Sequence, residues 1–388
     1  MAENQSFENA PINWIPAFVL ISTPLAALLI VPYYLLTHSV SWAVWAVFAF
    51  FMAWTGMSIT VGYHRLWSHR TYQAHPIVKW FLLIGGTLAV QGSVFDWCAG
   101  HRLHHRHVDD IYEDPYSAKR GFLFSHMGWM LKNYPSGHYD YKNIPDLKAD
   151  PVLVAQDKYY AVWILLTNLG LPALAGWLIG DVVGTLLLAG LLRLVLTHHF
   201  TFFINSLCHM FGTRPYTDTN TARDNPILAL FTWGEGYHNY HHYFQYDYRN
   251  GVKWWQYDPS KWFIYGLSKL GLTSDLKRVP DVTIQHAQTE MAFKRAERKV
   301  ATFSGNLTTD MQMVKERFTS EQQAFKQTIA EWQALKTKAI EMKKNEFAQR
   351  MNEVDDKLKD QFASIEQKLR NHVQQLDQVL GQLKGKQI

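Results

Sequence analysis

Residues 42–69 read WAVWAVFAFFMAWTGMSITVGYHRLWSH, an uncharged apolar stretch that runs into a segment containing two histidines. The uncharged part, residues 42–62, matches the roughly 20 residues that a helix needs to cross a hydrocarbon core of about 30 Å. His64 and His69 follow almost directly. The stretch therefore predicts a membrane-spanning helix that brings imidazoles to the membrane surface.

Three further apolar stretches predict three more membrane helices, at residues 15–36, 161–179 and 182–207. The four form two hairpins, and the turns around residues 37–41 and 180–184 contain no Lys or Arg. The segment between the hairpins, by contrast, carries lysines and arginines, including Arg102, Arg106 and Lys132. Because positively charged loops tend to stay in the cytoplasm, we expect both turns outside, and both termini and the middle segment inside.

The predicted fold class is an all-α membrane protein with four transmembrane helices in two hairpins, a cytosolic cap of histidine-rich helices, and a C-terminal helical or coiled-coil tail. A fifth apolar run, residues 81–95, is short and contains three glycines. We expect it to lie on the surface or to re-enter rather than to cross. Arg193 lies inside the fourth span, where a charge is costly, and it is expected to be either functional or part of a buried structural pair.

Composition divides the chain into a polar N-terminal segment, a membrane domain and a polar helical tail, at residues 1–14, 15–280 and 281–388. The tail contains no proline, and its apolar residues recur at steps of three and four, as in Phe362, Ile365 and Leu369. This spacing predicts long amphipathic helices. We expect the tail to pack on itself, with self-association through a coiled coil as the alternative.

Composition also argues against several classes of function. A formal net charge of +5 over 388 residues is too small to indicate nucleic acid binding. The two cysteines form no CxxC pair, so neither a zinc ribbon nor a disulfide framework is implied. The 15 Trp and 19 Tyr are typical of proteins at a lipid–water boundary.

Histidines gather in three short segments, HRLWSH at 64–69, HRLHH at 101–105 and HNYHH at 238–242, and His209 follows the fourth span. In the two triplets the spacing i, i+3, i+4 places three imidazoles on one helical face. Residues five apart on a regular helix diverge by about 140°. We therefore expect the helix to end between His64 and His69, or the two to serve different metals.

Neutral imidazole is the commonest metal ligand in proteins. Eight or nine imidazoles exceed what one tetrahedral zinc uses, and two metals with four or five ligands each fit the number. Imidazole suits Fe, Zn, Cu and Ni, so the number alone does not name the metal. Carboxylates near the clusters in sequence are expected to orient the rings; these are Glu235, Asp109, Asp110 and Asp114.

With these histidine segments the chain resembles the family of integral-membrane acyl-CoA and acyl-lipid Δ9 desaturases, to which the stearoyl-CoA desaturases belong. HRLWSH, HRLHH and GEGYHNYHH (234–242) are similar to that family's three histidine boxes. The segments DPYSAKRGFLFSHMGW (114–129) and NSLCHMFGTRPY (205–216) match the family as well. The resemblance covers roughly residues 15–275, and bacterial members are the nearest in character.

The resemblance implies two irons held by nine histidines, His64, His69, His101, His104, His105, His209, His238, His241 and His242. It places Asn205 on an asparagine that reaches one iron through water. It further implies a bent tunnel for the acyl chain, with Gln91, Trp97 and Thr201 along the tunnel and its bend, and Met52 and Gly56 near its closed end. No catalytic residue separate from the di-iron centre is implied.

The implied activity is O2-dependent insertion of a cis double bond at Δ9 of a saturated C16–C18 acyl chain. Animal acyl-CoA members carry an Arg-Asp pair where this chain has Ala99 and Gly100. The acyl carrier therefore stays open among CoA, phospholipid and acyl carrier protein. The tail lacks an HPGG-like haem segment, so electrons are expected from a separate reductase, ferredoxin or b5-type cytochrome. The expected location is a bacterial inner membrane, with the active site cytoplasmic.

Three other functions are weighed against desaturation. A membrane di-iron hydroxylase shares the histidine chemistry, but the WSH end of the first box and the NYHH of the third favour a desaturase. A membrane zinc hydrolase of lipid amides would need fewer ligands and a metal-bound water. A metal-storage or scaffold protein would act through the coiled tail.

Overall fold

The computed structural model describes residue 7 and residues 9–301, 309–344 and 351–384. The chain forms two compact units. The first comprises Met1–Thr213 and Thr219–Arg278, and the second comprises Arg214–Asp218 and Val279–Ile388. The division into functional domains at residues 15 and 281 stays a prediction.

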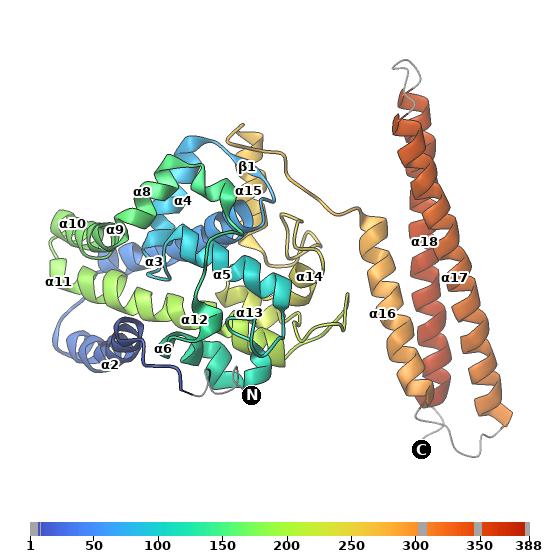
Figure 1. The fold of residues 1–388 in the computed structure, drawn as a ribbon, viewed down its shortest axis with the longest axis horizontal. Coiled ribbons are helices and arrows are strands. Elements are labelled where there is room, and N and C mark those ends of the chain that lie inside the picture. The colour runs from blue at the N-terminus through green and yellow to red at the C-terminus, as the bar shows by residue number, and fades with distance from the viewer. Residues whose placement is uncertain (1–6, 8, 302–308, 345–350, 385–388) are drawn as a thin grey trace. The chain divides into compact units, whose positions relative to one another are not determined.

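Four helices of the first unit are long and apolar enough to cross a membrane, namely Trp14–Thr37, Trp42–Ser68, Tyr160–Ile179 and Val182–Met210 (Figure 1). They confirm the four predicted spans, and the second and fourth extend further toward the histidines than predicted. Large apolar side chains on their outer faces are exposed, among them Leu36, Trp177 and Leu178. Exposed apolar surface of this extent needs a lipid environment.

The first span is the single helix α2 (Trp14–Thr37), whereas the other three change their helical winding along their length. The second span consists of α3 (Trp42–Met57) and η1 (Ser58–Ser68), and the third consists of α9 (Tyr160–Leu165), η5 (Leu166–Gly170) and α10 (Leu171–Ile179). The fourth consists of α11 (Val182–Thr185), η6 (Leu186–Leu192) and α12 (Arg193–Met210). The segments η1, η5 and η6 are π-helical. Such wider turns inside α-helices are rare and occur frequently at functional sites.

The turns of the two hairpins lie at the same end of the bundle. Gly180 ends α10 in the left-handed conformation, at φ +82°, which glycine adopts without steric cost. The carboxylate of Asp181 then accepts a hydrogen bond from the amide of Gly184 at 2.7 Å and caps α11. The hydroxyl of Tyr34, at the end of α2, donates to the same carboxylate at 3.1 Å. This bond ties the first turn to the second.

The fifth apolar run does not cross the bundle. It is divided between α4 (Pro76–Thr87) and α5 (Val94–His107), and the chain turns between them with positive φ at Val90 and Gly92. One face of α4 packs tightly on η1, because a side chain at Gly86 would overlap the ring of Tyr63. The expectation of a non-crossing helix is confirmed, and six of the 12 residues of α4 are buried.

Arg193 has a structural role in the fourth span. Its side chain is fully buried. The guanidinium donates to the carbonyl oxygens of Leu88 and Ala189, at 2.5 and 2.9 Å, and to the amide oxygen of Asn168 at 2.8 Å. These bonds satisfy an intramembrane charge with oxygen dipoles and join α4, η5 and α12.

Short elements connect the spans: η2 (Ala118–Arg120), η3 (Phe124–Gly128), α6 (Trp129–Leu131), η4 (Pro135–Gly137), α7 (Pro145–Lys148), α8 (Pro151–Lys158), α13 (Pro226–Phe231), α14 (His238–Tyr243) and α15 (Pro259–Lys269). Strands β1 (Gln73–Ala74) and β2 (Thr273–Ser274) pair antiparallel, with Gln73 opposite Ser274. The main core of this unit includes Val61, Leu82 and Ile264, all fully buried. It fixes η1 against α4, α5 and α15, so the ends of these helices hold their positions.

The second unit is a bundle of α16 (Asp281–Ala301), α17 (Thr309–Lys344) and α18 (Met351–Lys384), which lie side by side (Figure 1). Its core includes Phe293, Phe325 and Leu369. The tail therefore packs on itself, as the spacing of its apolar residues predicted. Self-association through the tail stays a prediction.

Candidate metal centre

His64 and His69 share one face because the helix that carries them is wound more widely than an α-helix. Within η1 the backbone bonds link residues five apart, and at its end the amide of His69 donates to the carbonyl oxygen of His64 at 3.0 Å. The two ring centroids lie 4.8 Å apart. The expectation that the helix ends between them, or that they serve different metals, is therefore wrong. Helical winding continues to Ser68, and both rings enter one group.

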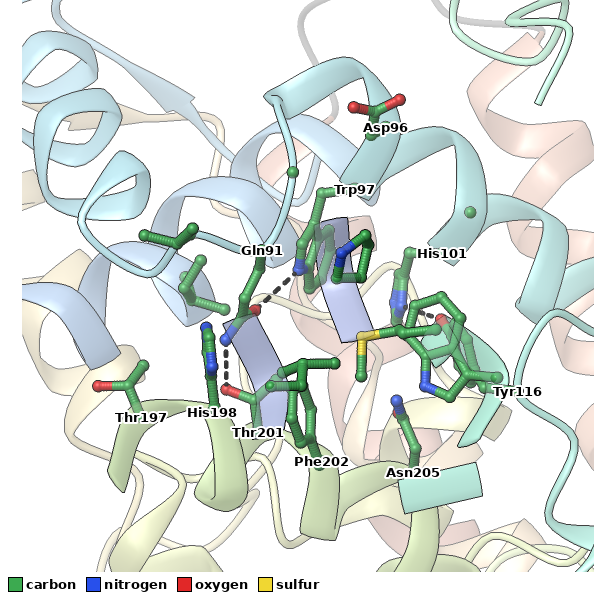
Figure 2. A pocket seen from close by; sticks show the side chains of 18 of the residues that line it. Gln91, Asp96, Trp97, His101, Tyr116, Thr197, His198, Thr201, Phe202 and Asn205 are labelled. Atoms are coloured by element: carbon green, nitrogen blue, oxygen red, sulfur yellow. Dashed lines mark hydrogen bonds between the residues drawn. The ribbon is translucent and has the colours of Figure 1, made fainter. Parts of the chain in front are cut away.

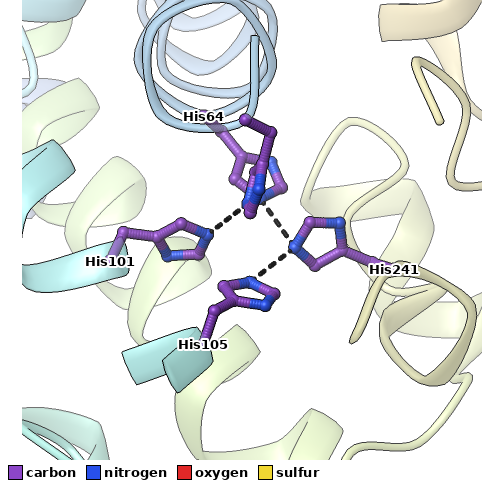
Figure 3. A group of neighbouring side chains, drawn as sticks. His64, His101, His105 and His241 are labelled. Atoms are coloured by element: carbon purple, nitrogen blue, oxygen red, sulfur yellow. Dashed lines mark hydrogen bonds between the residues drawn. The ribbon is translucent and has the colours of Figure 1, made fainter. Parts of the chain in front are cut away.

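Nine imidazoles converge in two groups, and within each group the ligand atoms lie within 4.8 Å of one another. The five-histidine group is His64, His69, His101, His105 and His241. The four-histidine group is His104, His209, His238 and His242. Figure 3 shows four members of the first group turned toward one another. All nine histidines singled out from the sequence are brought together here.

Each histidine triplet contributes to both groups. Helix α5 sends His101 and His105 to the five-histidine group and His104 to the other. Helix α14 does the reverse, with His241 in the first group and His238 and His242 in the second. Residues four apart on a helix point in nearly the same direction, whereas the residue between them points to one side. The two helices thus supply both groups from opposite walls.

Hydrogen-bond acceptors hold the outer nitrogen of several rings. Asp114 Oδ1 lies 2.8 Å from His104 Nδ1, and Glu235 Oε2 lies 2.9 Å from His64 Nδ1. An ionised carboxylate only accepts, so the proton of each ring resides on Nδ1. The inner nitrogen, Nε2, is then left with a bare lone pair.

These bare nitrogens face further imidazole nitrogens. His241 Nε2 lies 3.0 Å from His64 Nε2 and 2.9 Å from His105 Nε2. His104 Nε2 lies 3.3 Å from His242 Nε2. Nitrogen lone pairs pointed at one another are unfavourable unless a cation lies between them. The donor set therefore fits one metal ion in each group.

Burial favours the neutral form of six of these rings. It is the first cause that lowers the pKa of His69, His101, His105, His238, His241 and His242, and neighbouring imidazoles lower it further. A neutral imidazole is the form that binds a metal. The surroundings thus hold the site in its ligating state.

Three of the four expected carboxylates reach the imidazoles. Glu235 and Asp114 do so directly, and Asp109 does so through Thr221. The carboxylate of Asp109 accepts from the amide and the hydroxyl of Thr221 at 2.6 and 2.5 Å, and Thr221 Oγ1 lies 2.8 Å from His209 Nδ1. Asp110 does not reach the centre. Its carboxylate accepts from the amides of Tyr112 and Glu113, and these bonds lower its pKa.

A buried ionic network supports the first histidine segment. Arg65 is 1% exposed, and its guanidinium lies 3.0 Å from both Glu235 Oε1 and Asp258 Oδ1. Burial alone would raise the pKa of Glu235, but the interactions with the His64 ring and the Arg65 guanidinium hold it below its usual value. Glu235 therefore stays ionised between His64 and Arg65.

Sequence reasoning missed several residues that support the imidazoles. Tyr116 Oη lies 3.2 Å from His101 Nδ1. Asp224 Oδ1 accepts from the amides of Asn239 and Tyr240, at 2.9 and 3.1 Å, and so caps the helix that carries the third triplet. Asp224 precedes that helix by too many residues to form a recognisable capping box, so no local signal identifies it.

A cavity of about 690 Å³ adjoins the two groups and is lined by His64, His101 and His238 at one side. All five expected tunnel residues line it, namely Met52, Gly56, Gln91, Trp97 and Thr201. Figure 2 shows Gln91 bridging the wall: its amide donates to Thr201 Oγ1 at 3.0 Å and accepts from Trp97 Nε1 at 3.2 Å. Asn205 also lines the cavity, one helical turn before His209.

A model of the fatty acid desaturase family matches residues 40–265, which is more than half of the chain and contains all nine histidines. The chain belongs to the fatty acid desaturase family. With its four apolar helices, this desaturase-family protein is an integral membrane protein.

Individual relatives agree with the family match. The chain is 44% identical over 267 residues to acyl-CoA desaturase 1 of Saccharomyces cerevisiae, which covers 68% of the chain and 52% of that protein. It is 39% identical over 288 residues to a probable acyl-CoA desaturase of Schizosaccharomyces pombe, and this match covers 74% of the chain and 59% of that protein. It is 37% identical over 245 residues to stearoyl-CoA desaturase 4 of Mus musculus, and this match covers 62% of the chain and 69% of that protein. The chain thus spans little more than half the length of the two yeast relatives.

Proposed function

We propose that this desaturase-family protein inserts a cis double bond at Δ9 of a saturated C16–C18 acyl chain in an O2-dependent reaction. The observation that carries the proposal is the position of two groups of imidazoles at the wall of a largely apolar cavity. Such a cavity suits an alkyl chain.

We assign two irons to the nine histidines, one to each group, and Asn205 to the four-histidine group through a water. Asn205 supports this assignment because it lies one turn before His209 on α12 and therefore on the same helical face. When bound, the two irons supply the O2-derived oxidising power needed to break unactivated C–H bonds, which no side-chain acid or base provides.

The chain itself contributes orientation of the ligands. Asp114, Glu235 and Thr221 each hold the Nδ1 of one ring and direct its Nε2 inward. Partners of this kind are expected to raise metal affinity and to fix ring direction.

The cavity contributes placement of the substrate. Gln91, Trp97 and Thr201 are linked by hydrogen bonds across its wall, and Trp97 stacks on His101 with ring centroids 4.8 Å apart. A rigid wall at this point would hold one C–C bond beside the imidazole groups in the bent form that yields a cis product. Exclusion of water from the cavity would protect the oxidant from side reactions.

We propose CoA as the acyl carrier, since the relatives are named acyl-CoA and stearoyl-CoA desaturases. Phospholipid is the alternative, because the uncharged Ala99 and Gly100 stand where animal members carry an Arg-Asp pair. The space beside Gly100 is taken up by Tyr139, whose hydroxyl would lie 2.6 Å from a Cβ at that position. Supplying the same acyl chain on CoA, phospholipid and acyl carrier protein to membranes containing the protein distinguishes the carriers.

We further propose that electrons come from a separate reductase, ferredoxin or b5-type cytochrome. We also propose that both termini and the imidazole groups lie on the cytoplasmic side of a bacterial inner membrane. The lysines and arginines of the segment between the hairpins support this orientation, as do two hairpin turns without Lys or Arg at one end of the bundle. Protease accessibility of the tail in sealed vesicles tests the orientation.

The decisive experiment is expression of the full chain, with an electron donor, in a host that lacks desaturase activity. Fatty acids are analysed by gas chromatography–mass spectrometry after derivatisation that maps double bonds. We expect new cis-Δ9 C16 and C18 acids from the wild type and from His38→Ala, an exposed histidine outside both groups. His104→Ala and His241→Ala, one from each group, should yield none.

The same analysis separates the alternatives. Wild-type levels of product from His104→Ala or His241→Ala would overturn the proposal. Hydroxylated acids would indicate a hydroxylase, and an activity that proceeds without O2 would indicate a zinc hydrolase.

A further inference from the structure

A loop between α12 and α13 carries the side chain that orients His209. The backbones of Thr213 and Asp224 exchange two hydrogen bonds, of 3.0 and 2.7 Å, and so close residues 214–223 into a loop. On this loop, Thr221 Oγ1 lies 2.8 Å from His209 Nδ1. The direction of the His209 ring therefore depends on the position of one loop side chain.

The tip of this loop belongs to the compact unit of the tail. Residues Arg214–Asp218 group with Val279–Ile388, whereas the rest of the loop groups with the membrane helices. The tail lies outside residues 40–265, the part of the chain that the family model matches. A loop beside a metal ligand is thus held by a part of the chain that the family match does not include.

One face of α16 holds the tip through side-chain hydrogen bonds. Gln288 Nε2 donates to Tyr216 Oη at 3.2 Å, and Arg295 Nη1 donates to the carbonyl oxygen of Arg214 at 3.3 Å. Tyr216 is 6% exposed. Gln288 and Arg295 are seven residues apart, so they share a helical face, and Arg298 follows three residues later. The contact therefore extends over about three turns of α16.

An ionic cluster fixes the last residue of the tip. The carboxylate of Asp218 forms an ion pair with Arg298, and it lies 3.5 Å from Lys294 Nζ. The Asp218 side chain is 13% exposed. Burial alone would raise the pKa of Asp218, but the hydrogen bond from Arg298 and the charge of Lys294 hold it below its usual value. The carboxylate therefore stays ionised, three residues before Thr221.

The other face of α16 is fixed in the three-helix bundle. Val282, Phe293 and Ala296 are buried there, in a core shared with side chains of α17 and α18. Most of the stability of a protein helix comes from packing of this kind. The bundle therefore makes α16 a firm support for the loop.

We infer that the helical tail is a clamp on the loop that orients His209, and that Asp218 and Arg298 are positioning residues for the four-histidine group. The inference rests on the proposed function, because it takes that group to hold one of the two assigned irons. Fixing the tip removes conformational freedom from the short stretch that leads to Thr221. With the clamp open, Thr221 no longer holds the His209 ring, and the affinity of this group for iron falls. The five-histidine group shares no ligand with it and should keep its ion.

The test compares full-length variants purified in detergent and loaded with iron. The clamp variant, Lys294→Glu/Arg298→Glu, reverses both cations that face Asp218. The matched control, Lys368→Glu/Arg370→Glu, reverses two exposed cations of α18 that also form ion pairs. Competition with a chelator should show about tenfold weaker binding of one of two irons in the clamp variant, and wild-type binding of both in the control.

A second measurement depends neither on iron nor on activity. Hydrogen exchange of the backbone amides of residues 219–224, followed by mass spectrometry, should be faster in the clamp variant than in the control, because fewer contacts oppose local opening. Unchanged exchange, or faster exchange with unchanged iron affinity, would overturn the inference.

A His209→Ala background separates positioning from a general loss of stability. The four-histidine group has already lost a ligand there, so adding the clamp substitutions should cause no further loss of iron. Loss of the remaining ion would indicate damage to the whole membrane unit and would overturn the inference. Should the clamp variant fail to fold, Asp218→Asn decides, since it removes one charge with little change in volume. Weaker binding of one iron by Asp218→Asn supports the inference, and unchanged binding refutes it.

The outcome is distinguishable from failure of the proposed function. If the wild type binds fewer than two irons or inserts no double bond into any acyl chain, the proposed function fails, and the exchange measurement still tests the contact between the tail and the loop. If the wild type is active and binds two irons, and the clamp variant behaves as the control does, only the inference fails.

Discussion

The amide nitrogen of His69 lies 3.0 Å from the carbonyl oxygen of His64, five residues earlier. This bond ends a π-helical segment and places two imidazoles from one helix end in the same five-histidine group. A regular α-helix would have pointed them about 140° apart. Two ligands from a single rigid helix end are held more firmly than ligands from a loop.

The first prediction concerns the independence of the two groups. His69→Ala removes a ligand from the five-histidine group, and His104→Ala removes one from the four-histidine group. Each should lose the ion of its own group while the fold remains, because the two sets share no ligand. Iron per chain of protein purified in detergent, measured by mass spectrometry, should fall by one ion in each variant. His38→Ala is the control, and an unchanged iron content in either ligand variant contradicts the assignment.

The second prediction separates two neighbouring aspartates. Asp114→Asn removes the carboxylate that holds His104 Nδ1, and metal affinity should fall about 10–100-fold. Asp110→Asn should leave it unchanged, since the Asp110 carboxylate accepts from backbone amides of its own turn and from no ring of the two groups. Competition with a chelator of known affinity measures the difference. Equal losses in the two variants would show that the local charge, rather than the contact with His104, matters.

The third prediction concerns the buried ionic network. Arg65→Met leaves Glu235 and Asp258 buried without their cation, which should lower the free energy of unfolding by roughly 3–5 kcal/mol. Arg70→Met is the matched control. Arg70 lies 3.9 Å from Asp146 with a side chain that is 58% exposed, and such pairs contribute about 0–1 kcal/mol. Denaturation in detergent compares the variants, and similar losses would contradict the prediction.

The fourth prediction is a pH dependence of stability that arises from Asp224. Burial raises the pKa of this carboxyl to about 7, although the amides of Asn239 and Tyr240 oppose the shift. The folded protein therefore binds a proton that the unfolded chain releases near pH 4. Stability from this group is present at low pH and is lost as pH rises through about 7, by at most about 1.4 kcal/mol per pH unit.

Asp224→Asn provides the measurement of that dependence. The asparagine oxygen can still accept from the two amides that Asp224 caps, so the fold should persist. Unfolding of both proteins is followed from pH 5 to pH 8, and the difference between them cancels the titration of the histidines. The wild type should lose stability relative to the variant as pH rises. Parallel curves would show that Asp224 does not titrate in this range.

The four spans and the three histidine segments were predictable from sequence because their signals are local, whereas the full set of nine ligands, including the isolated His209, was implied by the family resemblance. An uncharged run long enough to cross a bilayer predicts a membrane helix wherever it occurs. A triplet at i, i+3, i+4 predicts shared direction on a helix without knowledge of any partner. The same local reasoning was wrong for His64 and His69, since it assumed α-helical winding at the end of the span.

What the sequence by itself determined is which helices form and that their histidines gather near one end. The tertiary structure alone decided how α5 and α14 divide their triplets between two groups, because that depends on the angle at which the helices face each other. It also decided that Asp224 caps α14 and that Trp233 fills the space at Gly56. These contacts join residues far apart in the chain, and packing between distant segments leaves no periodic trace in the sequence.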